Sequence, residues 1–66
     1  MITKDDMVAG QLVTYIGHNK LEEGVIKSVS DDKHVFVVYH CDNDWINYKY
    51  YTAARTEVKD LILGWR

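Results

Sequence analysis

The stretch GVIKSVSDDKHVFVVYH, residues 24–40, decides the fold of this chain. It contains two runs rich in β-branched and aromatic residues, 24–29 and 34–40, with a polar link at 30–33. Val, Ile, Phe and Tyr suit a pleated, half-buried surface, whereas Ser and Asp hydrogen-bond their own backbone in turns. The stretch therefore predicts a β-hairpin, and we expect the remaining strands to be added at its two edges.

Both faces of the second run are apolar for much of its length. In an extended strand Val35, Val37 and Tyr39 share one face, and Phe36 and Val38 share the other. A strand that is apolar on both faces is buried on both. The run is therefore interpreted as a central strand, or as a strand with one face under another chain.

The segments on either side of the hairpin predict further strands. Residues 11–16, QLVTYI, alternate in the strand period, and Gly24 opens the next strand, where its missing Cβ suits a bulge or a close backbone approach. Residues 45–51, WINYKYY, hold four of the eight aromatic residues and are interpreted as a fourth strand. A short helical or 3₁₀ turn is predicted at 57–61 and a last strand at 62–65.

Two segments leave alternatives open. Residues 52–56, TAART, contain two alanines that permit a helical turn and two threonines that do not favour one. Residues 3–9 form either one helical turn, with Thr3 as its N-cap, or an extended lead-in. No proline, repeat or low-complexity linker divides the chain, so residues 1–66 are predicted to form one domain.

Composition restricts the class of protein. Sixty-six residues, 47% of them hydrophobic, are close to the lower limit for an independently stable core. A single cysteine excludes a disulfide within the chain. The first ten residues do not resemble a signal peptide, and no apolar run approaches the roughly 18 residues of a membrane span. We therefore expect a cytoplasmic protein with no membrane contact.

The order of the predicted elements resembles that of SH3-like barrels, particularly the Tudor-like branch. The matching motifs are a Val-x-Tyr element at 13–15, a small residue before an aliphatic run at 24–26, Val-x-Tyr at 37–39 and Val-x-Asp-Leu at 58–61. The resemblance covers roughly residues 10–65, and small proteins of bacteria and their phages have a similar pattern. It implies an all-β fold: a single small SH3-like (Tudor-like) barrel of about five antiparallel strands, with a short 3₁₀ turn before the last strand.

The aromatic residues are the best functional candidates. Tudor-like domains commonly recognise methylated lysine or arginine through an aromatic cage, because ring faces attract a cation. The resemblance places Tyr15 at the first cage position, but the next positions fall near Glu22 and Asp42, which are not aromatic. The alternative interpretation is that Tyr15, Tyr39 and Tyr48 pack the core of a small domain.

We predict that Tyr15, Trp45, Tyr48 and Tyr51 contact a protein or peptide partner. Trp and Tyr are frequent at binding hot spots, and in the predicted strand Trp45 and Tyr51 share a face with Lys49. The same rings are suited to a homodimer interface. The sequence thus favours a non-enzymatic binding or adaptor module.

A nucleic-acid-binding accessory protein is the alternative function. Bases stack on exposed aromatic rings while basic side chains follow the phosphates, and Trp45, Lys49 and Arg55 supply both parts. The formal net charge of −2 argues against this alternative, because phosphate contacts depend on concentrated Lys and Arg.

Neither a metal, nor a cofactor, nor an enzymatic activity is expected. His40 and Cys41 are neighbours and point to opposite faces of a strand, while His34 lies six residues from His40. This spacing does not match that of zinc ligands. The sequence also lacks a Gly-rich phosphate loop.

Overall fold

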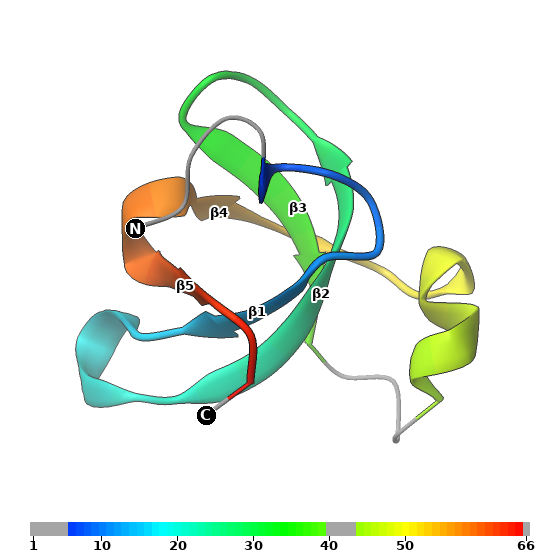
Figure 1. Cartoon of the computed structure of the whole chain (residues 1–66), viewed down its shortest axis with the longest axis horizontal. Coiled ribbons are helices and arrows are strands. Elements are labelled where there is room, and N and C mark those ends of the chain that lie inside the picture. The colour runs from blue at the N-terminus through cyan, green and yellow to red at the C-terminus, as the bar shows by residue number, and fades with distance from the viewer. Residues whose placement is uncertain (1–5, 40–43, 66) are drawn as a thin grey trace.

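A computed structural model describes residues 6–39 and 44–65 (Figure 1). Their strands form one antiparallel sheet in the order β4-β3-β2-β1-β5. The strands are β1 (Leu12–Tyr15), β2 (Glu22–Val29), β3 (His34–Val38), β4 (Ala54–Glu57) and β5 (Leu61–Leu63). The 3₁₀ helices between them are η2 (Gly17–Asn19), η3 (Trp45–Tyr50) and η4 (Val58–Asp60).

The predicted hairpin is the centre of this sheet. β2 and β3 pair antiparallel from Val25 opposite Val38 to Val29 opposite Val35. The polar residues between them close the turn, where the backbone N–H of Ser30 donates to the carbonyl of His34 at 3.1 Å. The all-β class and the five antiparallel strands are therefore confirmed.

The sheet is open rather than a closed barrel. β1 pairs with β2 and β5, and β3 pairs with β2 and β4, so that β4 and β5 lie at the two edges. η4 links these two edge strands directly along the chain, on one side of the twisted sheet in Figure 1. The sequence prediction is thus correct for strand number and direction, and it is not confirmed for barrel closure.

The core lies on the inner face of the sheet. Its buried residues are Met7, Val13, Ile26, Val35, Val37 and Leu61, with Tyr15, Tyr39 and Val58 packed against them. Gly24 permits this packing, because a Cβ there would lie 2.5 Å from Cγ1 of Val37 and 3.0 Å from Cδ1 of Tyr39. The close approach predicted at Gly24 is confirmed, and the bulge lies further along β2, between Ile26 and Ser28.

The outer face of the hairpin is also buried. Val25 and Val38 lie opposite each other and are 2% and 0% exposed, although they are not part of the inner core. The chain's own elements lie on β2: η3 contacts it, and the indole Nε1 of Trp65 donates to the carbonyl of Gly24 at 3.0 Å. The rings of Trp45 and Trp65 lie 5.0 Å apart, joining η3 to the C-terminal segment. Segments of the same chain thus cover the outer face of the hairpin, which explains why the run 34–40 is apolar on both faces.

The strand predicted for residues 45–51 is wrong, because this segment forms η3. Local polar groups fix the helix. The carboxylate of Asp44 accepts hydrogen bonds from Nδ2 of Asn47 and from the hydroxyl of Tyr51, each at 2.9 Å. The backbone N–H of Asn47 also donates to the carbonyl of Asp44 at 3.0 Å. These hydrogen bonds join residues three and seven positions apart, a spacing that a helical turn brings close and an extended strand does not.

The fourth strand is instead β4, within and just beyond the segment 52–56 that the sequence left open. Thr56 pairs with Val35 and is 7% exposed, so tertiary pairing selects the strand. The predicted 3₁₀ turn is confirmed as η4. The last strand, β5, begins and ends earlier than the predicted 62–65. It ends before Gly64, whose backbone has a φ of +77°.

The lead-in predicted for residues 1–9 lies partly outside the described residues, including the proposed N-cap Thr3. Within the described part, Met7 is buried in the core. Among residues 6–39 and 44–65, no helix is long and apolar enough to cross a membrane.

Candidate functional site

A cavity of about 480 Å³ lies where one end of β1, β2 and β3 meets β4 and η4. Two aromatic rings and four charged side chains give it its chemical character: Tyr15, Tyr39, Glu22, Arg55, Glu57 and Asp60. The topology brings these residues together, because β1 pairs with both β2 and β5 while β3 pairs with β4. No single segment of the chain contains the site.

The two tyrosines form a fixed aromatic wall. The rings of Tyr15 and Tyr39 lie 6.1 Å apart and are inclined at 75°, an edge-to-face arrangement that aromatic pairs prefer. The hydroxyl of Thr56 donates to the carbonyl of Ala54 at 3.2 Å. Because that hydroxyl has a single hydrogen, the phenol of Tyr39 donates to the oxygen of Thr56 at 2.9 Å. The orientation of the Tyr39 ring is therefore set at its hydroxyl end.

The cavity is acidic. Glu22, Glu57 and Asp60 contribute carboxylates against a single guanidinium, that of Arg55. Burial raises the pKa of the Tyr39 phenol, and the negative charges of Glu22 and Asp60 raise it further. Lys59 pairs with Glu57 at 3.3 Å, which leaves Glu22 and Asp60 as the carboxylates of the lining that favour a positively charged ligand.

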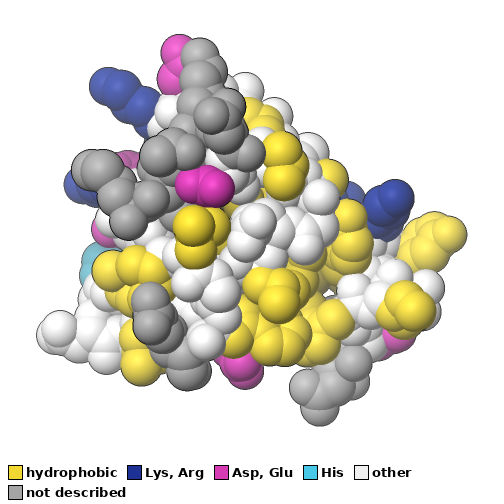
Figure 2. Space-filling model, viewed as in Figure 1, with side chains coloured by type: hydrophobic (Ala, Val, Ile, Leu, Met, Phe, Trp, Pro, Cys, Tyr) yellow, Lys and Arg dark blue, Asp and Glu magenta, His cyan; other side chains and the backbone are white. Residues whose placement is uncertain are grey.

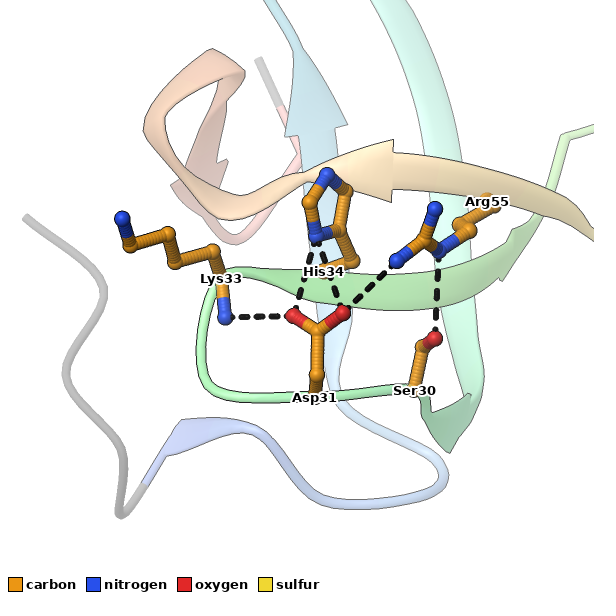
Figure 3. A network of polar contacts seen from close by, with 5 residues as sticks. All are labelled: Ser30, Asp31, Lys33, His34 and Arg55. Atoms are coloured by element: carbon orange, nitrogen blue, oxygen red, sulfur yellow. Dashed lines mark hydrogen bonds and ion pairs between the residues drawn. The ribbon is translucent and has the colours of Figure 1, made fainter.

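The guanidinium of Arg55 does not cancel this charge, because an ion pair outside the cavity engages it (Figure 3). Its Nη2 lies 2.7 Å from Oδ2 of Asp31, and its Nε donates to the hydroxyl of Ser30 at 3.1 Å. Asp31 also accepts the backbone N–H of Lys33 at 2.8 Å and lies 2.9 Å from Nδ1 of His34. One carboxylate thus ties the β2–β3 turn to β4.

We expect Asp31→Asn to lower the melting temperature at pH 7. The hydrogen bond from His34, the backbone N–H of Lys33 and the guanidinium of Arg55 hold the pKa of Asp31 below its usual range. A depressed pKa adds stability above the ordinary value of about 4, and this stability is lost as the pH falls through the folded-state pKa. Thermal unfolding from pH 7 to pH 2 should show the difference between variant and wild type shrinking below about pH 4.

Glu23→Gln is the matched control for this comparison, since Glu23 is an exposed carboxylate on β2. It should leave the melting temperature nearly unchanged at every pH. A difference between Asp31→Asn and wild type that is the same at pH 7 and at pH 2 would contradict the assigned role of the carboxylate.

The structure separates the four predicted contact residues. Tyr15 lines the cavity at the end of β1, whereas Trp45 packs on Trp65 and the hydroxyl of Tyr48 lies close to Gly10. Tyr51 follows η3 and lines a neighbouring cavity that shares two residues with the first. Tyr15 and Tyr51 therefore lie along one groove, and neither Trp45 nor Tyr48 is in its lining.

The residues of the nucleic-acid alternative are also dispersed. Trp45 and Lys49 belong to η3, whereas the guanidinium of Arg55 is held at the β2–β3 turn by Asp31. Lys49 is exposed, and Trp45 is partly buried against Trp65. Nucleic-acid binding stays a prediction, because the structure does not place these three side chains together on one surface.

The most exposed apolar side chains of η3 differ from those expected. Ile46 is 89% exposed and Tyr50 is 86% exposed. Figure 2 shows hydrophobic side chains on η3 at the right of the molecule and over the centre of the same face. The sequence assigns a contact role to Trp45 and Tyr51 because, in the strand predicted for 45–51, these two residues share a face. A homodimer through this region stays a prediction.

Sequence reasoning missed most of the acidic cavity. Tyr39 was interpreted as a core residue, and Glu22 was noted only as a departure from an aromatic cage. Asp60 belongs to the motif at 58–61, which predicts the fold and not a site. The pairing of Tyr15 with both Glu22 and Leu61 is what gathers the site, and the register of two strand pairs is needed to see it.

Metal binding finds no support among residues 6–39 and 44–65, where no three His, Cys, Asp or Glu side chains gather into a site. His40 and Cys41, considered in the sequence, lie outside the described residues.

The chemistry of the cavity is that of a cation site. The faces of Tyr15 and Tyr39 attract positive charge, and the carboxylates of Glu22 and Asp60 raise its local concentration. Comparison with known proteins found no matching family model, no matching curated protein and no matching solved structure.

Proposed function

We propose that this chain is a non-enzymatic binding module that receives a lysine or arginine side chain of a protein or peptide in the acidic cavity. The observation that carries the proposal is the fixed Tyr15–Tyr39 ring pair beside the carboxylates of Glu22 and Asp60. A cation placed there gains both a ring contact and a Coulombic attraction.

The strength of such contacts sets the expected affinity. A cation over an aromatic face gains about 0.5–2 kcal/mol, depending on how far it is desolvated. Exposed ion pairs add about 0.2–1 kcal/mol each. One cationic side chain therefore binds weakly, in roughly the millimolar range, and a longer segment must supply further contacts.

An SH3-like, Tudor-like fold is part of the proposal. Its support is the element order, with four strands, a 3₁₀ helix and a last strand, and the Val-x-Asp-Leu motif at 58–61 that spans η4. Tyr15, at the position of the first cage aromatic, lines the cavity. The partner ring is Tyr39, and carboxylates occupy the remainder of the site.

The first test is an amide NMR titration with short Gly/Ser peptides that carry one central residue. The residue is arginine, trimethyl-lysine or citrulline, which keeps the shape of arginine without its charge. Saturable shifts at Tyr15, Glu22 and Tyr39 with either cation, and none with citrulline, are the expected result. Equal shifts with citrulline, or no shifts with either cation, would contradict the proposal.

Glu22→Gln is expected to weaken binding of the cationic peptides by up to about fivefold, because it removes a charge from the cavity wall. Glu23→Gln, one residue along β2 and outside the lining, is the matched control and should leave the dissociation constant unchanged. Ultraviolet titration of the phenols gives a second readout. The pKa of Tyr39 should fall in Glu22→Gln and not in Glu23→Gln.

A mixed-sequence single-stranded oligonucleotide, titrated in the same way, addresses the alternative function. Shifts centred on Lys49 and the indole of Trp45 that weaken as salt rises would favour nucleic-acid binding over the proposed function.

A further inference from the structure

The acidic cavity lies next to another cavity. A second cavity of about 400 Å³ lies beside the segment that leads into β4. It is lined by Val37, Tyr39, Tyr51, Thr52, Ala53 and Ala54. Because Tyr39 and Ala54 line both cavities, the two are adjacent along one groove.

The walls of the second cavity are held in place. The hydroxyl of Tyr51 donates to Asp44 at 2.9 Å, and Nζ of Lys27 donates to the carbonyl of Tyr51, also at 2.9 Å. On the other side, Thr56 donates to the carbonyl of Ala54. Tyr51 is thus fixed at both its ring and its backbone. A site whose walls are already ordered loses little entropy when a ligand enters.

The two cavities differ in charge. None of the six residues that line the second cavity is formally charged at neutral pH, and two of them are alanines. The first cavity carries three carboxylates. A charged side chain gains nothing in the second cavity, whereas an apolar one loses contact with water against Ala53 and the ring of Tyr51.

We infer that the partner is a bipartite extended segment, with lysine or arginine in the acidic cavity and an apolar side chain in the second. This inference rests on the proposed function. Residues 54–57 line the first cavity and residues 51–54 line the second, an offset of about three residues, or roughly 10 Å along an extended chain. The two ligand residues are therefore two to four positions apart.

The test compares peptides in a Gly/Ser background. One peptide carries a single arginine, and the others add one leucine two, three or four positions before or after it. We expect one leucine position to tighten the dissociation constant about tenfold. In the wild-type protein, the same peptide should shift the amide signals of Thr52 and Ala53, which line only the second cavity and which the arginine-only peptide leaves in place.

Ala53→Phe fills the second cavity and should abolish the gain from leucine while the arginine-only peptide binds as before. Two results would overturn the inference: leucine that adds no affinity at any position, or a gain from leucine that persists in Ala53→Phe. Both leave the proposed function standing if the arginine-only peptide binds. Failure of every cationic peptide would instead overturn the proposed function.

Discussion

Replacing Trp65 with alanine is expected to lower the free energy of unfolding by about 2–3 kcal/mol, near the lower end for truncation of a large aromatic residue because Trp65 is only partly buried. Its indole donates to the carbonyl of Gly24 and packs on Trp45 at 5.0 Å. These contacts lie on β2, the strand that carries the buried outer-face residue Val25. Urea denaturation followed by circular dichroism measures the change.

Trp65→Phe separates the ring from its hydrogen bond. It keeps an aromatic contact with Trp45 and removes the donor to Gly24, so we expect a loss of about 1 kcal/mol. Trp45→Ala should also destabilise, because Trp45 is the other half of the pair. If Trp65→Ala costs less than about 0.5 kcal/mol, the range of an ordinary surface substitution, the outer layer is not a stabilising part of the fold.

Gly24→Ala is expected to cost about 2 kcal/mol, a typical penalty for overpacking. The added Cβ would lie 2.5 Å from Cγ1 of Val37, which is fully buried and has no free direction in which to move. It would also press on the Tyr39 ring at 3.0 Å, so binding of cationic peptides should weaken in the same variant. Chemical denaturation and the peptide titration measure the two effects.

A double-mutant cycle tests the cause of this penalty. Val37→Ala removes the methyl group that the new Cβ would meet. Gly24→Ala should therefore cost much less in the Val37→Ala background than in the wild type, with a coupling energy of about 1 kcal/mol. Strict additivity of the two substitutions would place the penalty elsewhere.

The central hairpin was predictable because its signal is local. The alternation of β-branched residues, the Ser-Asp turn and the small residue at Gly24 all indicate the same structure, and β2 and β3 follow it. The 3₁₀ turn η4 was predictable for the same reason. Whether the sheet closes into a barrel was not predictable, because the sequence cannot show whether the edge strands β4 and β5 pair.

The error at residues 45–51 has a physical cause. Aromatic residues at alternate positions suit a strand, and the hydrogen bonds that Asp44 accepts from Asn47 and Tyr51 are invisible in that pattern. β4 shows the opposite case. Its one alanine and one threonine differ in strand propensity, and pairing with β3 decides the outcome.

The candidate site was predictable only through Tyr15. The other groups reach the cavity from the start of β2, the residue after β3, and η4. Glu22 and Asp60 are ordinary charged residues in sequence, and their proximity to Tyr39 depends on strand register. When strand pairing brings acidic side chains together from distant segments, the sequence contains no local motif for the site.

The Trp45–Trp65 contact also determines what optical spectroscopy can report about this protein. The chain has two tryptophans, and both belong to this one pair on the outer layer of the sheet. Indole emission therefore follows the docking of η3 and the C-terminal segment, whereas the five tyrosines are divided between the groove and η3. Tryptophan emission is thus specific to the outer layer, and its agreement with circular dichroism of the sheet, or its divergence from it, during unfolding tells whether the layers melt together.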